Sequence, residues 1–384
     1  MRDRTSRPGT NSLVPMPTYD HLDYRPLTAP VTAAQVTAFK RWARSTGQAW
    51  AQLTAASIIG WVVGGFAIVI FVFVGGFAIC GVLVRALLRA LGVSDGTAAA
   101  LSTAIVAVVF FGIAGLIVWG MIANSNKTWR RHYRLDQFAR ANGLSAFPVS
   151  ADPRYAGSIF GIGSSRASYD RIQSTSGRFL DIGSYRYTTG SGKNRTTHTW
   201  GYLAMQLDRR LPQMVLDSKA NNGLFGSTNL PKTFSRDQVL SLEGDFDKYF
   251  TLYCPREYER DALYVFTPDL MALLVDNAGA FDVEIVDDWL FVYSTTPIDT
   301  TDPAQIGRMF QIVDTVGAKT LSQSDNYSDD RVPHAQAASL AGPDASRNLI
   351  APQGRRLRTR VSWVSIAVFA VVVIIWFVVP IFTR

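Results

Sequence analysis

Three long apolar runs without a charged side chain dominate the pattern of hydrophobic and polar positions in this 384-residue chain. Each run is longer than the roughly 20 apolar residues that an α-helix needs to cross a bilayer. The pattern therefore predicts transmembrane helices over residues 53–84, 97–123 and 361–382. None of the three contains the ionisable side chains that ion and proton pathways usually require, which disfavours a transporter.

The polar part of the chain is predicted to contain one folded domain. Residues 1–30 are predicted to be disordered, and residues 31–52 to form a juxtamembrane helix. Residues 127–321 mix strand and helix patterns, which predicts a cytoplasmic, mainly antiparallel β domain with a few helices. Residues 322–360 are rich in Ser, Asp, Ala, Pro and Gly, which predicts a flexible linker with a basic end. The fold class is therefore α+β: three transmembrane helices plus a soluble domain.

Local signals place several elements inside these segments. Thr32 and Gln35 form a capping-box pattern at the start of the juxtamembrane helix. Thr267 followed by Pro268 is typical of a helix start, and Gly279 of its end. The remaining expected elements are strands over 178–187, 198–207, 211–217 and 249–254, a hairpin of 283–285 and 289–293 with its turn at 287–288, and a helix over 302–317.

Lys and Arg residues flank the apolar runs unevenly. Only Arg85 and Arg89 lie between the first two runs. The segments before the first run, after the second and before the third are heavily basic. The positive-inside rule therefore places the N-terminus and the large domain in the cytoplasm, at a cell membrane that the chain crosses several times; the opposite orientation is the alternative. Two groups of cations beside the bilayer are the candidate lipid-headgroup residues: Lys127, Arg130, Arg131, Arg134, Arg355, Arg356, Arg358 and Arg360.

The net charge of +8 does not belong to the folded domain. Residues 135–354 carry 20 Lys and Arg against 26 Asp and Glu, a net charge of −6. A nucleic-acid-binding protein should instead carry a basic patch on its folded domain. Cations next to a membrane favour binding to the anionic lipids of the inner leaflet, so we expect a membrane partner and no nucleic acid.

Groups that could carry chemistry are scattered. Cys254 and His198 have the chemistry of a nucleophile and its base, but packing is the favoured interpretation of a lone Cys that ends an apolar strand. Asp245 and Asp247 resemble a metal- or nucleotide-sugar-binding carboxylate pair, but the favoured interpretation is strand alternation, with two outward acids flanking an inward Phe246. We therefore predict no catalytic residue, no metal site and no cofactor, and leave open whether the protein is an enzyme, with a non-enzyme preferred.

Parts of the chain resemble bacterial membrane proteins. Residues 246–293, with Phe-x-x-x-Phe, Thr-Pro-Asp-Leu-Met and Asp-Trp-Leu-Phe-Val-Tyr, resemble a membrane-protein family defined only as a domain of unknown function. The run from Ile-Phe-Gly-Ile-Gly at 159–163, through Ser-Tyr-Arg-Tyr at 184–187, to Asn-Gly-Leu-Phe-Gly at 222–226 is similar to uncharacterised multi-pass membrane proteins of actinobacteria. The resemblance implies a multi-pass topology and brings no catalytic residues with it.

Two functions of different classes remain. The first is an integral membrane protein that presents a doubly tethered cytoplasmic interaction domain to an unknown protein partner. The alternative is a membrane-associated enzyme or a lipid-headgroup-binding protein whose site lies in the soluble domain. Gly60 and Gly64 form a small-xxx-small pattern that lets another helix approach closely, so a homo-oligomer is also left open.

The predicted orientation can be tested with a fused reporter. A reporter that is active only in the cytoplasm should be inactive when it is fused after Thr383, because the third transmembrane helix carries that end of the chain to the outside. The same reporter inserted between residues 322 and 360 should be active. An active reporter after Thr383 would reverse the orientation.

Overall fold

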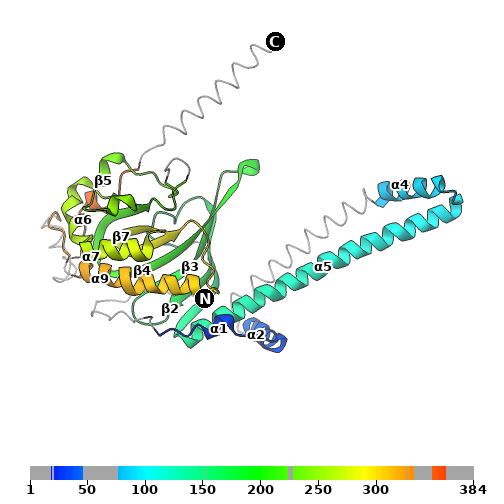
Figure 1. Ribbon diagram of the computed structural model, residues 1–384, viewed down its shortest axis with the longest axis horizontal. Helices are drawn as coiled ribbons and strands as arrows, with labels where there is room; N and C mark the ends of the chain where they lie inside the picture. The colour runs from blue at the N-terminus through cyan, green and yellow to red at the C-terminus, as the bar shows by residue number, and fades with distance from the viewer. Residues whose placement is uncertain are drawn as a thin grey trace, which may run out of the picture. The chain divides into compact units, whose positions relative to one another are not determined.

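The computed structural model describes residues 19, 21–45, 77–151, 153–223, 228–325, 327–332 and 348–359. The chain divides into two compact units (Figure 1). Unit 1 contains Met1–Tyr24 and Phe138–Arg384, and unit 2 contains Arg25–Gln137.

Unit 2 is helical. It contains α1 (Arg25–Thr28), α2 (Ala33–Ser45), α4 (Phe77–Ala90) and most of α5 (Asp95–Ala141). The capping box is confirmed, since the Thr32 backbone N–H donates to Gln35 Oε1 over 2.8 Å and the Gln35 N–H donates to Thr32 Oγ1 over 3.3 Å. At the end of α4, Gly92 has φ +83°, which lets the Val93 N–H turn back to the Leu88 carbonyl.

Among the described residues, α5 is the one helix long and apolar enough to cross a membrane. Its 47 residues correspond to about 70 Å at the usual rise of an α-helix. It contains the predicted second transmembrane helix over 97–123 and continues well beyond it. The predicted first helix lies outside the described residues except for 77–84, which begin α4, and the predicted third helix lies wholly outside them.

Unit 1 is built on a seven-stranded antiparallel sheet, which confirms the predicted α+β class. The strand order is β1-β2-β3-β4-β6-β5, and β7 pairs with β4. Because the same β4 residues pair with β7 and with either β3 or β6, β7 follows one edge of β4 while β3 and β6 share the other. The strands are β1 (Leu144–Ala151), β2 (Ser164–Ser174), β3 (Leu180–Thr189), β4 (Thr196–Ser218), β5 (Val239–Leu240), β6 (Phe250–Tyr253) and β7 (Asp282–Ser294).

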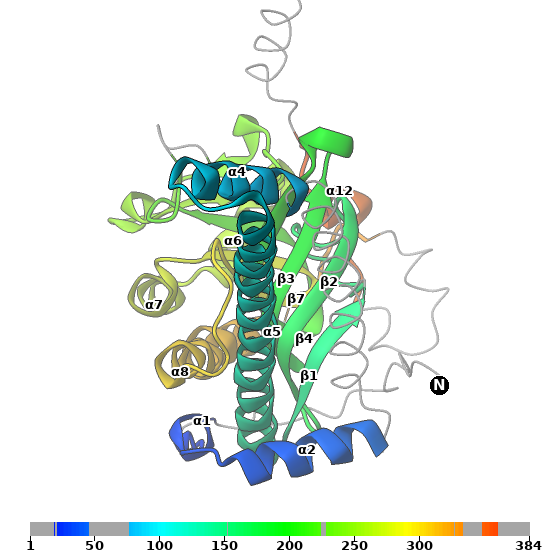
Figure 2. The same cartoon turned by 90° about the vertical axis from the view of Figure 1, so that its right-hand side faces the viewer.

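Helices cover one face of this sheet. Figures 1 and 2 show α7 and its neighbours α8 and α9 gathered on one side of β4 and β7. Contact is close at Gly317, where an added Cβ would lie 3.0 Å from the Met205 sulfur on β4. The helical segments of this part are α6 (Glu259–Val265), α7 (Pro268–Leu273), η7 (Leu274–Ala278), α8 (Pro303–Ile312), η8 (Val313–Gly317) and α9 (Ala318–Ser324), with shorter turns η2 (Gly192–Asn194), η4 (Arg236–Gln238), η5 (Phe246–Lys248) and η6 (Arg256–Tyr258).

The other face carries an aromatic core. Tyr202, Phe291 and Tyr293 are fully buried there, and Phe160 packs onto Tyr202 edge to face at 5.4 Å. Leu357, from a short C-terminal segment with helix α12 (Pro352–Arg355), also belongs to this cluster. The domain core therefore includes residues that follow the predicted linker in the sequence.

The predicted hairpin at 283–293 is wrong. Residues 282–294 form one continuous strand, β7, because both of its halves pair with β4. Asp287 has φ +52° and lies opposite Leu211, where the register of β4 also shifts. The Asp-Asp signal therefore marks a bulge within the strand, and the strands expected at 198–207 and 211–217 likewise belong to the single strand β4.

Helix signals in the domain are confirmed. Thr267 caps α7, with its hydroxyl accepting from the Leu270 N–H, and Gly279 follows η7. The helix expected over 302–317 begins at Pro303 and continues through η8 into α9. These signals depend on hydrogen bonds between residues close in the sequence, which the sequence itself displays.

Both segments that we expected to lack structure pack partly against unit 1. Tyr19 donates its N–H to Asp314 and stacks near Phe310 at 4.8 Å, although residues 1–30 were expected to be disordered. Residues 348–359 of the expected flexible linker are also ordered, because their apolar side chains Ile350 and Leu357 are buried. Residues 333–347 lie outside the described part of the chain.

Candidate membrane-facing sites

A cluster of aromatic side chains holds α2 against α5 in unit 2. Phe39 of α2 lies edge to face with Trp129 at 6.0 Å and with Tyr133 at 5.6 Å, both on α5. Val36 and Ala43, one turn away on either side of Phe39, are buried as well. The apolar stripe of α2 therefore faces α5, as the helical spacing predicts, and its charged residues face outward.

The two helices together carry what we call the basic collar, which begins where the uncharged stretch of α5 ends. Its α5 residues are those predicted from the sequence, and its α2 residues are additional. Within 25–45 and 123–137 the sequence contains a single acid, Asp136, which is buried. The collar consists of Lys40, Arg41, Arg44, Lys127, Arg130, Arg131 and Arg134.

Lys40 shows how closely these cations are placed. Its Nζ donates to Asn126 Oδ1 over 3.0 Å and lies 5.6 Å from the centre of the Trp129 ring. Burial, and then the charge of Arg44, lower the pKa of Lys40. A group of closely placed cations gains stability from a nearby anion, so the collar has the electrostatics of an anion-binding surface.

His132 lies inside the same packing and stays neutral at physiological pH. Burial, followed by the charge of Arg131, lowers its pKa to about 4. Its ring packs edge to face with Trp129 at 6.0 Å. The histidine therefore contributes to helix packing, and the charge of the collar comes from Lys and Arg alone.

In unit 1 three of the other four predicted lipid-binding residues, Arg355, Arg356 and Arg358, belong to residues 348–359, which we call the C-terminal strap. Its lower end pairs with the domain backbone: the Ser235 N–H donates to the Arg358 carbonyl over 3.0 Å, and Phe234 forms a β-bridge with Thr359. The Gln238 side chain brackets Arg358, accepting from its N–H over 2.8 Å and donating to its carbonyl over 2.9 Å. These backbone and side-chain hydrogen bonds therefore fix the strap at Arg358 and Thr359.

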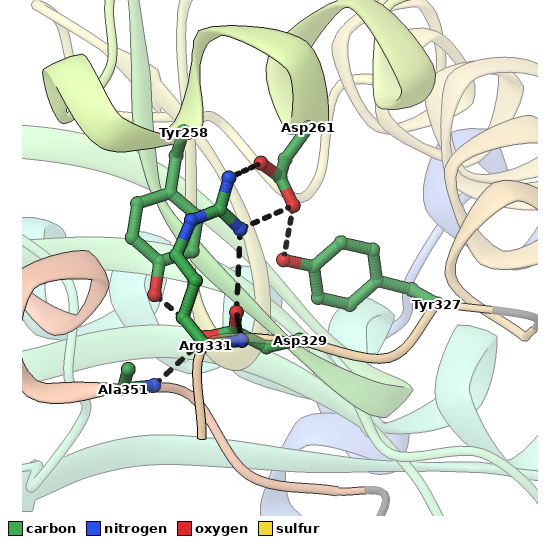
Figure 3. Close-up of polar contacts among 6 residues, drawn as sticks. All are labelled: Tyr258, Asp261, Tyr327, Asp329, Arg331 and Ala351. Carbon is green, nitrogen blue, oxygen red and sulfur yellow. Dashed lines mark hydrogen bonds and ion pairs between the residues drawn. The ribbon is translucent and has the colours of Figure 1, made fainter. Parts of the chain in front are cut away.

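The upper end of the strap is held by a buried carboxylate, shown in Figure 3. Asp329 Oδ2 accepts from the Ala351 N–H over 2.8 Å and from the Tyr258 hydroxyl over 2.6 Å. Arg331 lies 4.3 Å from the centre of the Tyr258 ring and binds both Asp329 and Asp261. Burial alone would raise the pKa of Asp329, but the Ala351 N–H and the other donors outweigh it and lower the pKa, so the anchor is charged at neutral pH.

The strap arginines are engaged on the protein surface. Arg356 binds Asp287 with two hydrogen bonds of 3.2 and 2.8 Å, and Arg358 binds Asp237 over 2.6 Å. Arg355 donates to the Ile350 carbonyl, and Arg360 lies outside the described residues. The Arg356 and Arg358 side chains are still 51% and 65% exposed, so lipid phosphates have access to them. The two predicted cation groups belong to separate units.

The strap also reaches the aromatic core through Gln213. The Leu357 N–H donates to Gln213 Oε1 over 2.7 Å, and Gln213 Nε2 donates to Glu284 Oε1 over 2.6 Å. Glu284 is fully buried and accepts from the Tyr293 hydroxyl and from both donors of Ser158. A buried carboxylate with four donors is well satisfied, so this chain of bonds ties the strap to the centre of the sheet.

A second buried acid, Asp181, pairs with a cation on the same face. Arg171 on β2 donates to Asp181 on β3 with its shortest contact at 2.6 Å. The hydroxyls of Tyr155 and Tyr202 also donate to Asp181, over 2.5 and 3.0 Å. Burial, and then the Asp181 charge, raise the pKa of Tyr155, which keeps its proton in place as a donor.

Asp217 and Asp282 are two further buried acids. Among the described residues, neither forms a hydrogen bond with a basic side chain. Asp282 Oδ1 accepts from the Ser218 N–H over 2.8 Å and from Asn221 Nδ2 over 3.0 Å, and Asp217 accepts from Thr228. Burial raises the pKa of Asp217 to about 6. Burial, with the Asp217 charge adding to it, raises the pKa of Asp282 to about 7. Both acids thus titrate closer to physiological pH than an exposed Asp does.

Cys254 and His198 are not brought together. His198 stacks on Tyr187 near the start of β4, whereas Cys254 follows β6, which pairs with the opposite end of β4. Burial, and then the charges of Glu259 and Asp261, raise the pKa of Cys254 to about 12. The thiol is therefore protonated, and packing accounts for it.

The carboxylates of Asp245 and Asp247 do not converge on a common point. Asp245 directly precedes the turn η5 and Asp247 lies within it, so neither is in a strand and the predicted alternation is wrong, although Phe246 is buried as expected. Asp245 binds Lys248 over 2.8 Å, and Asp247 accepts from the Leu242 N–H. In the described part of the chain, no group of three His, Cys, Asp or Glu side chains is placed to hold a metal ion.

Comparison with known proteins adds little to this description. No protein-family model and no curated protein matches the sequence. The crystal structure of the mycobacterial trehalose monomycolate transport factor A, TtfA, is similar to this chain with a TM-score of 0.33 and 13% sequence identity, over 50% of this chain and 91% of that chain. The function therefore has to be argued from the residues of this chain.

Sequence reasoning missed the groups that hold the strap. Gln213, Gln238 and Asp329 are polar residues without a recognisable motif, and their partners are up to 144 residues away. One signal was present: Ile350 and Leu357 are large apolar residues in an otherwise polar segment, and both are buried.

The Asp217–Asp282 pair predicts an inverse dependence of stability on pH. The folded chain holds protons on these acids up to about pH 6 to 7, whereas an unfolded Asp loses its proton near pH 3.9. The folded state thus binds more protons in this window, and the pair's contribution to the free energy of unfolding falls as pH rises from about 4 to about 7. Asp282→Asn, which keeps an acceptor and cannot ionise, should flatten this fall and raise the unfolding temperature at pH 8.

Thermal unfolding of the detergent-solubilised full chain at stepped pH measures this effect. The control is Asp245→Asn, an exposed acid, which should leave the pH dependence unchanged. An Asp282→Asn variant with the wild-type slope between pH 4 and 7 would contradict the prediction.

Proposed function

We propose that this chain is an integral membrane protein that holds an α+β interaction domain at the cytoplasmic surface of the cell membrane, tethered at both ends and bound to anionic lipids. The proposal includes the transmembrane helices predicted over 53–84 and 361–382 and the resemblance to multi-pass proteins of actinobacteria. The observation that carries it is the exposure of α5.

The apolar side chains of α5 are exposed on all sides of the helix. Val108, Phe111, Leu116 and Trp119 are each between 67% and 72% exposed. Val109 and Val118, nine residues apart and therefore on opposite sides of the helix, are also 56% and 53% exposed. A core helix of a soluble protein would bury such residues, because leaving each of them exposed to water costs about 1.5 to 3 kcal/mol of stability. A lipid environment removes this cost, which supports a transmembrane role for α5.

The basic collar supports contact with anionic lipid. On α5 the cations of the collar begin at Lys127, directly after the uncharged run. When this run crosses the bilayer, these cations lie at the level of the headgroup phosphates. Each such cation contributes about 1 kcal/mol to binding at a negatively charged leaflet. The strap supports the second tether, because it leads from the domain core to residue 361, where the last apolar run begins.

Neutralising the collar should weaken its preference for anionic lipid. The variant Arg44→Gln/Lys127→Gln/Arg130→Gln removes three exposed charges, or about 3 kcal/mol of attraction at low salt. In electron paramagnetic resonance of the full chain in phosphatidylcholine bilayers with spin-labelled phosphatidylglycerol, the fraction of motionally restricted label should fall. Lys193→Gln/Arg195→Gln/Arg260→Gln, three exposed cations of the domain, is the matched control and should change nothing. Equal effects of both variants would contradict a specific role for the collar.

The partner of the domain can be sought at α6. Leu263 and Tyr264 are neighbouring large apolar residues that α6 exposes, a pattern more typical of a protein contact than of a solvated helix. A photo-reactive amino acid at Leu263, in the full chain in intact cells, should give one defined cross-linked product that is lost in Tyr264→Glu. The same probe at the exposed residue Ala304 of α8 should not give it. No product at 263, or the same product from both positions, would count against an interaction domain.

A further inference from the structure

The strap leaves almost no free chain between the domain and the last apolar run. Thr359 is bridged to Phe234, and Arg360 alone separates it from residue 361. An extended residue spans at most about 3.6 Å, so residue 361 lies within about 7 Å of Thr359. When residues 361–382 cross the bilayer, the part of unit 1 around Phe234 and Thr359 is therefore held near the membrane surface, and its charges determine how closely it approaches the headgroups.

The surface around this point is basic although the domain is acidic. Residues 228–240 contain Lys232 and Arg236 and a single acid, Asp237. Asp237 is itself neutralised, since it binds Arg358 over 2.6 Å and lies 3.8 Å from Arg256. Arg256 and Arg358 thus flank this one carboxylate, and Lys232 and Arg236 lie within five residues of it in the sequence, in a domain whose net charge over 135–354 is −6. Such a local excess of positive charge complements an anionic bilayer.

An apolar side chain lies beside these cations. Val239 is the first residue of β5, the last strand of the sheet order, and its side chain is 43% exposed. It directly follows Gln238, whose amide brackets Arg358 of the strap. Apolar residues next to Lys and Arg are typical of protein surfaces that rest on the boundary between headgroups and acyl chains.

We propose that the β5 edge of unit 1, formed by Lys232, Arg236, Val239, Arg256 and Arg358, lies on the bilayer and binds the phosphates of anionic lipids. The proposal rests on the proposed function, because it requires residues 361–382 to cross the membrane. It adds a lipid-binding surface on the folded domain itself, distinct from the basic collar of unit 2. The strap fixes which edge of the domain faces the membrane.

The test measures how close the β5 edge lies to lipid in the reconstituted full chain. In a Cys80→Ser background, Thr233→Cys places a fluorescent label on an exposed residue of this edge. The buried Cys254 is left in place. Ala304→Cys on α8 is the matched control, because α8 belongs to the opposite face of the sheet from the strap (Figure 2). Vesicles contain phosphatidylcholine with or without phosphatidylglycerol, and a lipid with a spin label near its headgroup quenches the fluorophore.

We expect strong quenching at 233 and little at 304 in anionic vesicles. Adding Lys232→Gln/Arg236→Gln should remove at least half of the quenching at 233, as should the omission of phosphatidylglycerol. Lys193→Gln/Arg195→Gln should leave it unchanged. Equal quenching at both labels, no quenching at 233, or quenching that is insensitive to lipid charge and to both charge variants would overturn the proposed lipid-binding edge.

Alkaline extraction of the same vesicles separates this proposal from the one on which it rests. Protein that stays in the membrane at high pH but shows no quenching at 233 retains its tethers and refutes the β5 edge alone. Protein that alkali removes from the vesicles has no membrane-spanning helix, which refutes the proposed function and the lipid-binding edge with it.

Discussion

The cost of exposing an uncharged apolar helix to water constrains everything else in this protein. The helix α5 has no charged residue between Asp95 and Lys127, and its large side chains are exposed throughout that stretch. A water-soluble monomer would leave several such side chains unburied, each at about 1.5 to 3 kcal/mol. A bilayer removes that cost and at the same time dictates where charges can stand, which explains why cations begin abruptly at the end of this run.

In the proposed arrangement, the short strap that joins the domain to the last apolar run limits how the domain can move. The strap is fixed by Asp329 at its upper end, by Gln213 in the middle and by Gln238 at its lower end. Gln213 in turn binds Glu284, which is buried in the aromatic core. A rigid tether, unlike a flexible one, orients the domain as well as holding it near the surface. A 33-residue flexible linker would have allowed any face of the domain to meet the membrane.

The sequence predicted those parts of the fold that depend on hydrogen bonds between residues close in the chain, and it failed where distant segments pair. The capping box at Thr32 and the helix start at Thr267 were predicted correctly because their hydrogen bonds join residues three positions apart. The pair Asp287 and Asp288 was misread as a turn, since a bulge and a turn need similar residues and only the shared partner β4 tells them apart. The strap was missed for the same reason, since its partners are distant in the sequence.

The arrangement of charge within unit 1 follows from this constraint. Acids are buried at Asp181, Glu284 and Asp282, each with donors from neighbouring strands and loops, whereas cations gather on the edge where the strap leaves the domain. The charge of Asp181 is balanced by Arg171 and the other two acids are held by internal donors, so none of the three is presented on the surface. In the proposed arrangement, the charge next to the point of attachment therefore matters more for contact with a bilayer than the net charge of −6 over residues 135–354.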